Sequence, residues 1–130
     1  MRGKLMQQNL LMVWVTNMAS VIRGSDNFDS NDYGGLGHNQ TWQDLTASRA
    51  KDTTYTNNSG KPIQVIIRYV SNAVYEYGRL YVDGLHVSSA GLANNSSDTI
   101  WNVSAIVPNG STYRFEDQDA VTSITWLELR

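Results

Sequence analysis

Short β-type segments separated by turn signals dominate the sequence from residue 53 to residue 130. The clearest turn signals are Asn57-Asn58-Ser59-Gly60, Asp83-Gly84 and Pro108-Asn109-Gly110. The strands expected between such signals are Thr53–Thr56, Pro62–Ser71, Gly78–Val82, Leu85–Ser89, Thr99–Val107, Ser111–Glu116 and Val121–Leu129. Strands of this length and spacing predict an all-β protein, and we expect an antiparallel β-sandwich of short strands.

Hydrophobic alternation is clearest in Pro62–Ser71, and it predicts which face is buried. One face carries Ile63, Val65, Ile67 and Tyr69. The other face is apolar at Ile66 and Val70. We therefore predict a central strand, or one whose outer face meets another subunit. In Val121–Leu129 the alternation groups Val121, Leu127 and Leu129 on one face, and Ile124 and Trp126 on the other.

The first 40 residues differ from the rest. Residues 1–17 contain an apolar segment behind Arg2 and Lys4, and a helix would place Met6, Leu10 and Val13 on one face. Three interpretations stay open: an oligomerising or docking arm, a secretory signal, and the incidental start of a fragment. The unbroken stretch Leu10–Val15 is far short of the about 20 residues of a membrane span, so we expect no membrane insertion.

The expected organisation has three parts. Residues 1–17 form the arm, residues 18–40 form a polar linker rich in Gly, Asp and Asn, and residues 41–130 form the β-sandwich domain. Within Thr41–Ser48 we expect a short strand, with Trp42 and Leu45 as buried anchors. The length of 130 residues allows one domain with a modest core, which oligomerisation could supplement.

Charge and composition exclude several classes of function. The net charge is −2 and the ten basic residues are scattered, so no surface for nucleic acid is expected. Cysteine is absent, which excludes disulfides and thiolate metal sites.

Metal and catalytic sites are also not expected. A polar run only partly fits a calcium loop, because Tyr33 and Gln40 stand where ligands belong; the run comprises Asp26, Asp29, Asn31, Asp32 and Gly34. His38 and His86 lie far apart, and Glu76 and Glu116 would pair only by chance. We predict no enzyme activity, no metal and no cofactor.

Binding residues are expected in the middle of the chain, in loops or at strand ends. Aromatic rings can stack on the apolar faces of sugars, and Asn side chains can bind hydroxyl groups. The candidate contact residues are Tyr75, Tyr77, Asn94, Asn95 and Trp101. The alternative is ordinary packing, above all for Trp101, which could be half buried in the core.

From Asp26 onward the chain resembles the C-terminal tip region of tail fibre proteins of tailed bacteriophages and prophages. The resemblance covers about 100 residues and rests on the order and spacing of short segments taken together. These segments are Asp26-Asn27-Phe28-Asp29, Gly35-Leu36-Gly37, residues 40–49, Thr53-Thr54-Tyr55-Thr56-Asn57, residues 60–65, residues 106–113 and Trp126-Leu127-Glu128-Leu129-Arg130. Two departures stand out. Lys51-Asp52 replaces a small apolar pair, and Ser71–Trp101 matches no part of the family.

The resemblance implies a non-enzymatic β-sandwich module at the distal end of a virion tail fibre. It implies a homotrimer that helps recognise a bacterial surface, with lipopolysaccharide, a capsule sugar or an outer-membrane protein as receptor. No receptor-binding residue carries over, because the unmatched stretch lies where receptor-binding loops would be expected. The alternatives are a structural trimerising virion or baseplate component without receptor contact, and a carbohydrate-binding module.

Overall fold

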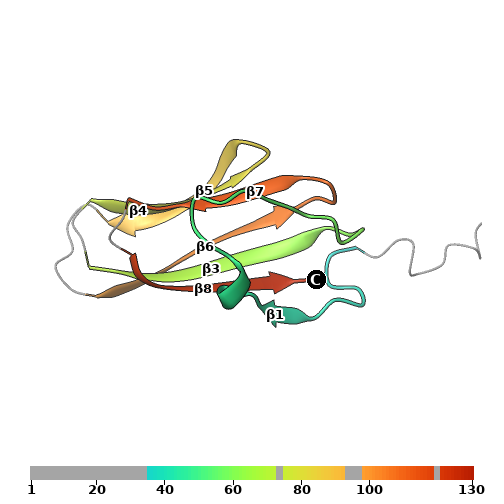
Figure 1. The fold of residues 1–130 in the computed structure, drawn as a ribbon, viewed down its shortest axis with the longest axis horizontal. Helices are drawn as coiled ribbons and strands as arrows, with labels where there is room; N and C mark the ends of the chain where they lie inside the picture. Colours follow the sequence, from blue (N-terminus) through green and yellow to red (C-terminus); the bar gives the residue numbers. More distant parts are fainter. Residues whose placement is uncertain (1–34, 73–74, 93–97, 119–120) are drawn as a thin grey trace, which may run out of the picture. The chain divides into compact units, whose positions relative to one another are not determined.

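Two four-stranded antiparallel sheets face each other in a computed structural model that describes residues 35–72, 75–92, 98–118 and 121–130 (Figure 1). Sheet A has the strand order β1-β8-β3-β6, and sheet B has the order β2-β7-β4-β5. The elements are β1 (Trp42–Asp44), the 3₁₀ helix η1 (Thr46–Ser48), β2 (Tyr55–Thr56), β3 (Ile63–Ser71), β4 (Glu76–Val82), β5 (Leu85–Leu92), β6 (Thr99–Val107), β7 (Thr112–Glu116) and β8 (Val121–Leu129). The predicted antiparallel β-sandwich is confirmed. The expected arm over residues 1–17 and the calcium-like run lie outside the described residues.

The core lies between the two sheets and follows the alternation of β3. This strand pairs with β6 on one side and β8 on the other, so it is central, as predicted. Its inward side chains pack against residues of sheet B such as Leu80 and Phe115. The buried apolar core consists of Ile63, Val65, Ile67, Tyr69, Leu80, Val82, Val103, Val107, Tyr113, Phe115 and Trp126.

Two turns lie at the predicted places, one within a hairpin of sheet B and one joining β6 of sheet A to β7 of sheet B. Asp83 and Gly84 have φ angles of 49° and 77°, which the predicted type I′ turn requires, and Val82 pairs directly with Leu85. At the second turn, the Ser111 amide donates to the Pro108 carbonyl at 3.1 Å.

Strands β4 and β5 extend further than the sequence indicated, to Glu76 and Leu92. Glycines in both strands weaken the β signal there, but close packing requires them. A Cβ at Gly91 would lie 2.0 Å from the Glu76 carbonyl oxygen.

Trp42 is not the buried anchor that the sequence predicts. It pairs with Leu129 in β1, on the outer face of sheet A, and is 49% exposed. Leu45 is half-buried and packs against the core. The edge strand β1 has only three residues, all exposed, so the Trp42 ring is only partly covered.

The two ends of the sandwich differ. Thr41 and Arg130 exchange backbone hydrogen bonds of 3.0 and 3.1 Å, and we call this the Arg130 end. At the opposite end Ser71 pairs with Thr99 and Val121, and we call this the Ser71 end. Figure 1 shows that strands β3, β6 and β8 run the length between these two ends.

Candidate functional site

The predicted contact residues have different surroundings in the structure. Tyr75 lies in the turn before β4, is 64% exposed and has a φ of 64°. A bulky residue with positive φ is strained, and such strain often marks a functional position. Trp101 is opposite Tyr69 in β6 and packs half-buried against the core, in agreement with the packing alternative. Asn94 and Asn95 lie outside the described residues.

Tyr77 lies on the outer face of sheet B, in a row of aromatic and arginine side chains. Residues paired across antiparallel strands share a face, and alternate residues of one strand share it too. Arg79 pairs with Glu116, and Tyr81 pairs with both Arg114 and His86. We call this surface the Tyr–Arg face; it consists of Tyr77, Arg79, Tyr81, His86, Arg114 and Glu116. Of these residues only Tyr77 was predicted from the sequence, although the alternation Tyr77-x-Arg79-x-Tyr81 is visible in the chain.

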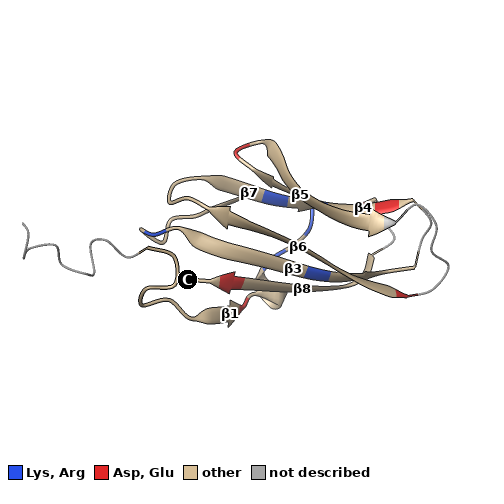
Figure 2. Ribbon diagram, turned by 180° about the vertical axis from the view of Figure 1, so that it is seen from behind, with Lys and Arg blue, Asp and Glu red and all other residues tan. Residues whose placement is uncertain are grey.

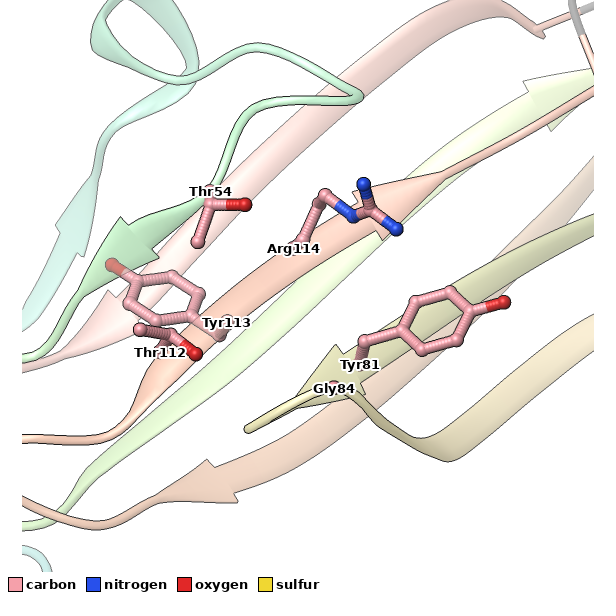
Figure 3. A pocket seen from close by; sticks show the side chains of 6 residues that line it. All are labelled: Thr54, Tyr81, Gly84, Thr112, Tyr113 and Arg114. Carbon is pink, nitrogen blue, oxygen red and sulfur yellow. The ribbon is translucent and has the colours of Figure 1, made fainter.

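A hollow of about 270 Å³ opens on this side of sheet B (Figure 3). Its lining residues are Thr54, Tyr81, Gly84, Thr112, Tyr113 and Arg114. In Figure 3 the Tyr81 ring lies near the Arg114 side chain, and Thr54 and Thr112 lie across the hollow from them. The Arg114 guanidinium carbon lies 5.6 Å from the centre of the Tyr81 ring. The hollow thus combines hydroxyl groups, a cationic donor and an aromatic ring.

Neighbouring groups hold the lining side chains in place. Arg114 forms an ion pair with Glu116, and the His86 ring centre lies 5.4 Å from that of Tyr81. The Thr112 amide donates to Asp83 Oδ1 at 2.8 Å. Hydrogen bonds from the Thr112 amide and the Ser111 hydroxyl lower the pKa of Asp83, so this carboxylate beside the hollow is charged at neutral pH.

The outer face of sheet A has the opposite character. Figure 2 shows no charged residue along β6, and Arg68 is the charged residue of β3. Ile66 pairs with Leu127 and Ser104, and Val70 pairs with Ile100. We call this surface the apolar face; it consists of Trp42, Ile66, Val70, Ile100, Ile106, Leu127 and Leu129. The outer face of sheet B is thus aromatic and polar, whereas the outer face of sheet A carries mostly apolar side chains, interrupted by Arg68.

A buried carboxylate lies between the sheets near the Arg130 end. Glu128 shares the inward face of β8 with Trp126 and is 0% exposed. It accepts hydrogen bonds from Arg49 Nε at 2.9 Å, the Tyr113 hydroxyl at 2.7 Å, Trp126 Nε1 at 3.0 Å and Arg130 at 2.8 Å. Burial raises the pKa of Tyr113 to about 12, with Glu128 adding to the effect. Since four groups saturate this carboxylate, we assign it a structural role. Its two-residue spacing from Trp126 puts Glu128 on the same face of the strand, but no local sequence signal indicates that a carboxylate there is buried.

The other titratable candidates do not form sites among the described residues. Glu76 faces the core at the start of β4, whereas Glu116 belongs to the outer face of sheet B, so these two carboxylates cannot act as a pair. His38 and His86 are both exposed. Across the described ranges, no group of three or more His, Asp or Glu residues is placed to hold a metal ion.

Lys51, one of the departures from the family pattern, pairs with Asp117 at 2.6 Å. A small apolar residue at position 51 would leave that carboxylate without this ion pair.

Comparisons of the chain with protein-family models, with curated proteins and with solved structures found no match. In the described part of the chain, no helix has the length and apolar character needed to cross a membrane.

Proposed function

We propose that this chain is a tail fibre tip module that attaches a phage to its bacterial host through a surface receptor. The observation that carries the proposal is the Tyr–Arg face, a half-buried row of aromatic, arginine and hydroxyl groups on the outer side of sheet B. Such groups favour polar, ring-shaped ligands, so the structure supports a surface glycan over an outer-membrane protein.

The attachment mechanism in this proposal is multivalent. A shallow open hollow binds one ligand weakly, but several copies of the module on one tip bind a dense glycan surface together. Linked sites raise the apparent affinity by about 10²–10⁴ without any new contact.

The apolar face supports the proposed homotrimer, because sister copies would cover it. Replacing Ile106, which is 58% exposed, with Asp is expected to turn the trimer into monomers, since a charge in an apolar interface has no partner. Light scattering at micromolar concentration checks this. Val87→Asp, at a residue 49% exposed on β5, is the matched control and should stay trimeric. A wild-type protein that is monomeric under these conditions contradicts the trimer.

The second candidate is a structural virion component that trimerises without touching a receptor. The apolar face alone favours it, because assembly needs no more than this surface. The Tyr–Arg face would then be an ordinary solvated surface without a ligand.

Cell binding separates the two candidates. Fluorescently labelled full-length protein is expected to bind a subset of strains in a panel that differs in lipopolysaccharide and capsule. Tyr77→Ala is expected to weaken this binding, because it removes a ring from the Tyr–Arg face. Thr122→Ala, at an exposed residue of β8, is the control and should bind like the wild type. No binding to any strain would favour the structural component.

A further inference from the structure

We infer that the hollow on the outer face of sheet B binds one neutral hexopyranose unit of a glycan. Only the bacterial source of that glycan rests on the proposed attachment function. The ligand class itself is argued from the size, chemistry and charge of the hollow.

The size and shape of the hollow fit a single sugar ring. Its volume of about 270 Å³ lies just below the about 300–1,000 Å³ typical of pockets for drug-sized ligands. It is lined by Gly84 of the β4–β5 hairpin and by residues of the paired strands β4 and β7. A peptide that binds as an added β-strand needs a free sheet edge. Strand β7 at the hollow is flanked by β4 and β2, so this mode of peptide binding is not favoured there.

The chemistry of the lining suits a polyol with one apolar face. The Tyr81 ring offers an aromatic surface for the C–H groups of a pyranose (Figure 3). Thr54 and Thr112 add hydroxyl groups, and the Arg114 guanidinium has several N–H donors for sugar oxygens. A flat apolar ligand would leave these polar groups without partners, so a ligand rich in hydroxyl groups is favoured.

The local charge favours a neutral sugar over an acidic one. Arg114 already forms an ion pair with Glu116, and Arg79 faces the same carboxylate across the strand pair. The charged Asp83 lies beside Gly84 at the edge of the hollow. Two arginines are thus balanced by two carboxylates, counting His86 as neutral. A carboxylate or phosphate on the ligand would compete with Glu116 for Arg114 and would be repelled by Asp83, so it would lose hydration without a matching ion pair.

The hollow is also held in shape before a ligand arrives. The Glu116 ion pair positions Arg114, the His86 ring packs beside Tyr81, and Asp83 fixes the backbone of Thr112. Side chains that are already ordered cost less entropy on binding, which compensates for the small contact area.

The test is a titration of the full chain with glucose, galactose, mannose and glucuronic acid. Binding is monitored through the NMR chemical shifts of the β4 and β7 amides. We expect saturable binding of at least one neutral hexose, with a Kd of about 1 mM. We also expect the affinity to stay the same between about 50 mM and about 500 mM salt, because no net charge pairs with the ligand. Tyr81→Ala should weaken binding by at least about tenfold, the equivalent of losing one ring contact.

Two further variants guard against a folding artefact. Thr54→Val removes one hydroxyl from a loop residue while keeping its shape, and it should weaken binding severalfold. Arg68→Ala, on the outer face of sheet A, is the control: it removes a charged side chain away from the hollow and should bind like the wild type. Three results would overturn the inference. They are binding of glucuronic acid but of no neutral hexose, an affinity that falls as the salt concentration rises, and a Tyr81→Ala variant that binds as tightly as the wild type. If the protein binds cells but no hexose, this inference is wrong and the attachment function stands. If it binds a hexose but no cells, the attachment function is wrong and this inference stands.

Discussion

Replacing Glu128 with Gln is expected to lower the free energy of unfolding by about 3–5 kcal/mol, the usual cost of removing one partner of a buried ion pair. The carboxylate is fully buried, and the side chain of Arg49 is only 15% exposed. A glutamine would leave Arg49 without its counter-charge. It would also direct an NH₂ group at donors that now bind a carboxylate oxygen, among them the Tyr113 hydroxyl and Trp126 Nε1. Denaturant unfolding followed by tryptophan fluorescence measures the loss.

The same substitution at an exposed ion pair is the control. Glu116 pairs with Arg114 on the surface of sheet B, where the arginine side chain is 41% exposed. Glu116→Gln should change the free energy of unfolding by about 0.5 kcal/mol or less, because exposed pairs contribute little. Equal effects of the two substitutions would contradict the structural role of Glu128.

Glu128 also gives the stability a definite dependence on pH. Burial alone raises the pKa of Glu128, but hydrogen bonds from Arg49 and Tyr113 and the charges of Arg49 and Arg130 lower it below its ordinary value overall. The charged form is therefore bound more favourably in the folded state. Its contribution is present above the ordinary glutamate pKa of about 4.3, and it is lost as the pH falls through the lower pKa of the folded state. Glu128→Gln should lose less stability than the wild type between neutral and acidic pH.

Replacing Asn57 with Ala is expected to cost roughly 2–4 kcal/mol of unfolding free energy, since it leaves several polar groups near the core without partners. The Asn57 side chain is fully buried, and its Nδ2 donates to the carbonyls of Lys61, Val107 and Pro108 at 2.8–3.1 Å. Its Oδ1 accepts from the amide and hydroxyl of Ser59. One side chain thus joins the turn before β3 to the turn after β6.

The neighbouring asparagine provides the matched comparison. Asn58 is exposed, so Asn58→Ala should change the free energy of unfolding by about 0.5 kcal/mol or less. Thermal and denaturant unfolding of the two variants side by side checks the prediction. If Asn57→Ala were as stable as Asn58→Ala, the hydrogen bonds of Asn57 would contribute nothing measurable.

The fold could be predicted because strand periodicity and turn chemistry are local properties. In β3 the alternation fixed which side chains enter the core, and Asp83-Gly84 fixed the hairpin. Glu128 could not be placed in this way, because a carboxylate in an alternating strand ordinarily marks the solvent side. Its burial depends on Arg49 and Tyr113, which come from distant parts of the chain. The prediction for Trp42 was wrong for the converse reason: a large aromatic ring ordinarily indicates burial, but β1 lies at the edge of its sheet.

The candidate site was only partly accessible from the sequence. Tyr77 stood out as an aromatic residue near a turn, and its neighbours on the same strand could have been included by alternation. Arg114 could not, because the register between β4 and β7 places it beside Tyr81, and no turn joins these two strands directly to set that register.

The buried polar side chains of Glu128 and Asn57, with their hydrogen-bond partners, both lie near the Arg130 end. Glu128 pairs with Val65, six residues along β3 from Ser71, which corresponds to about 20 Å of strand. Exchanging or lengthening the segments that join strands at the far extremity would leave both polar anchors intact. Loop replacement at that extremity would then change the surface there while the thermodynamic stability of the scaffold stays nearly constant.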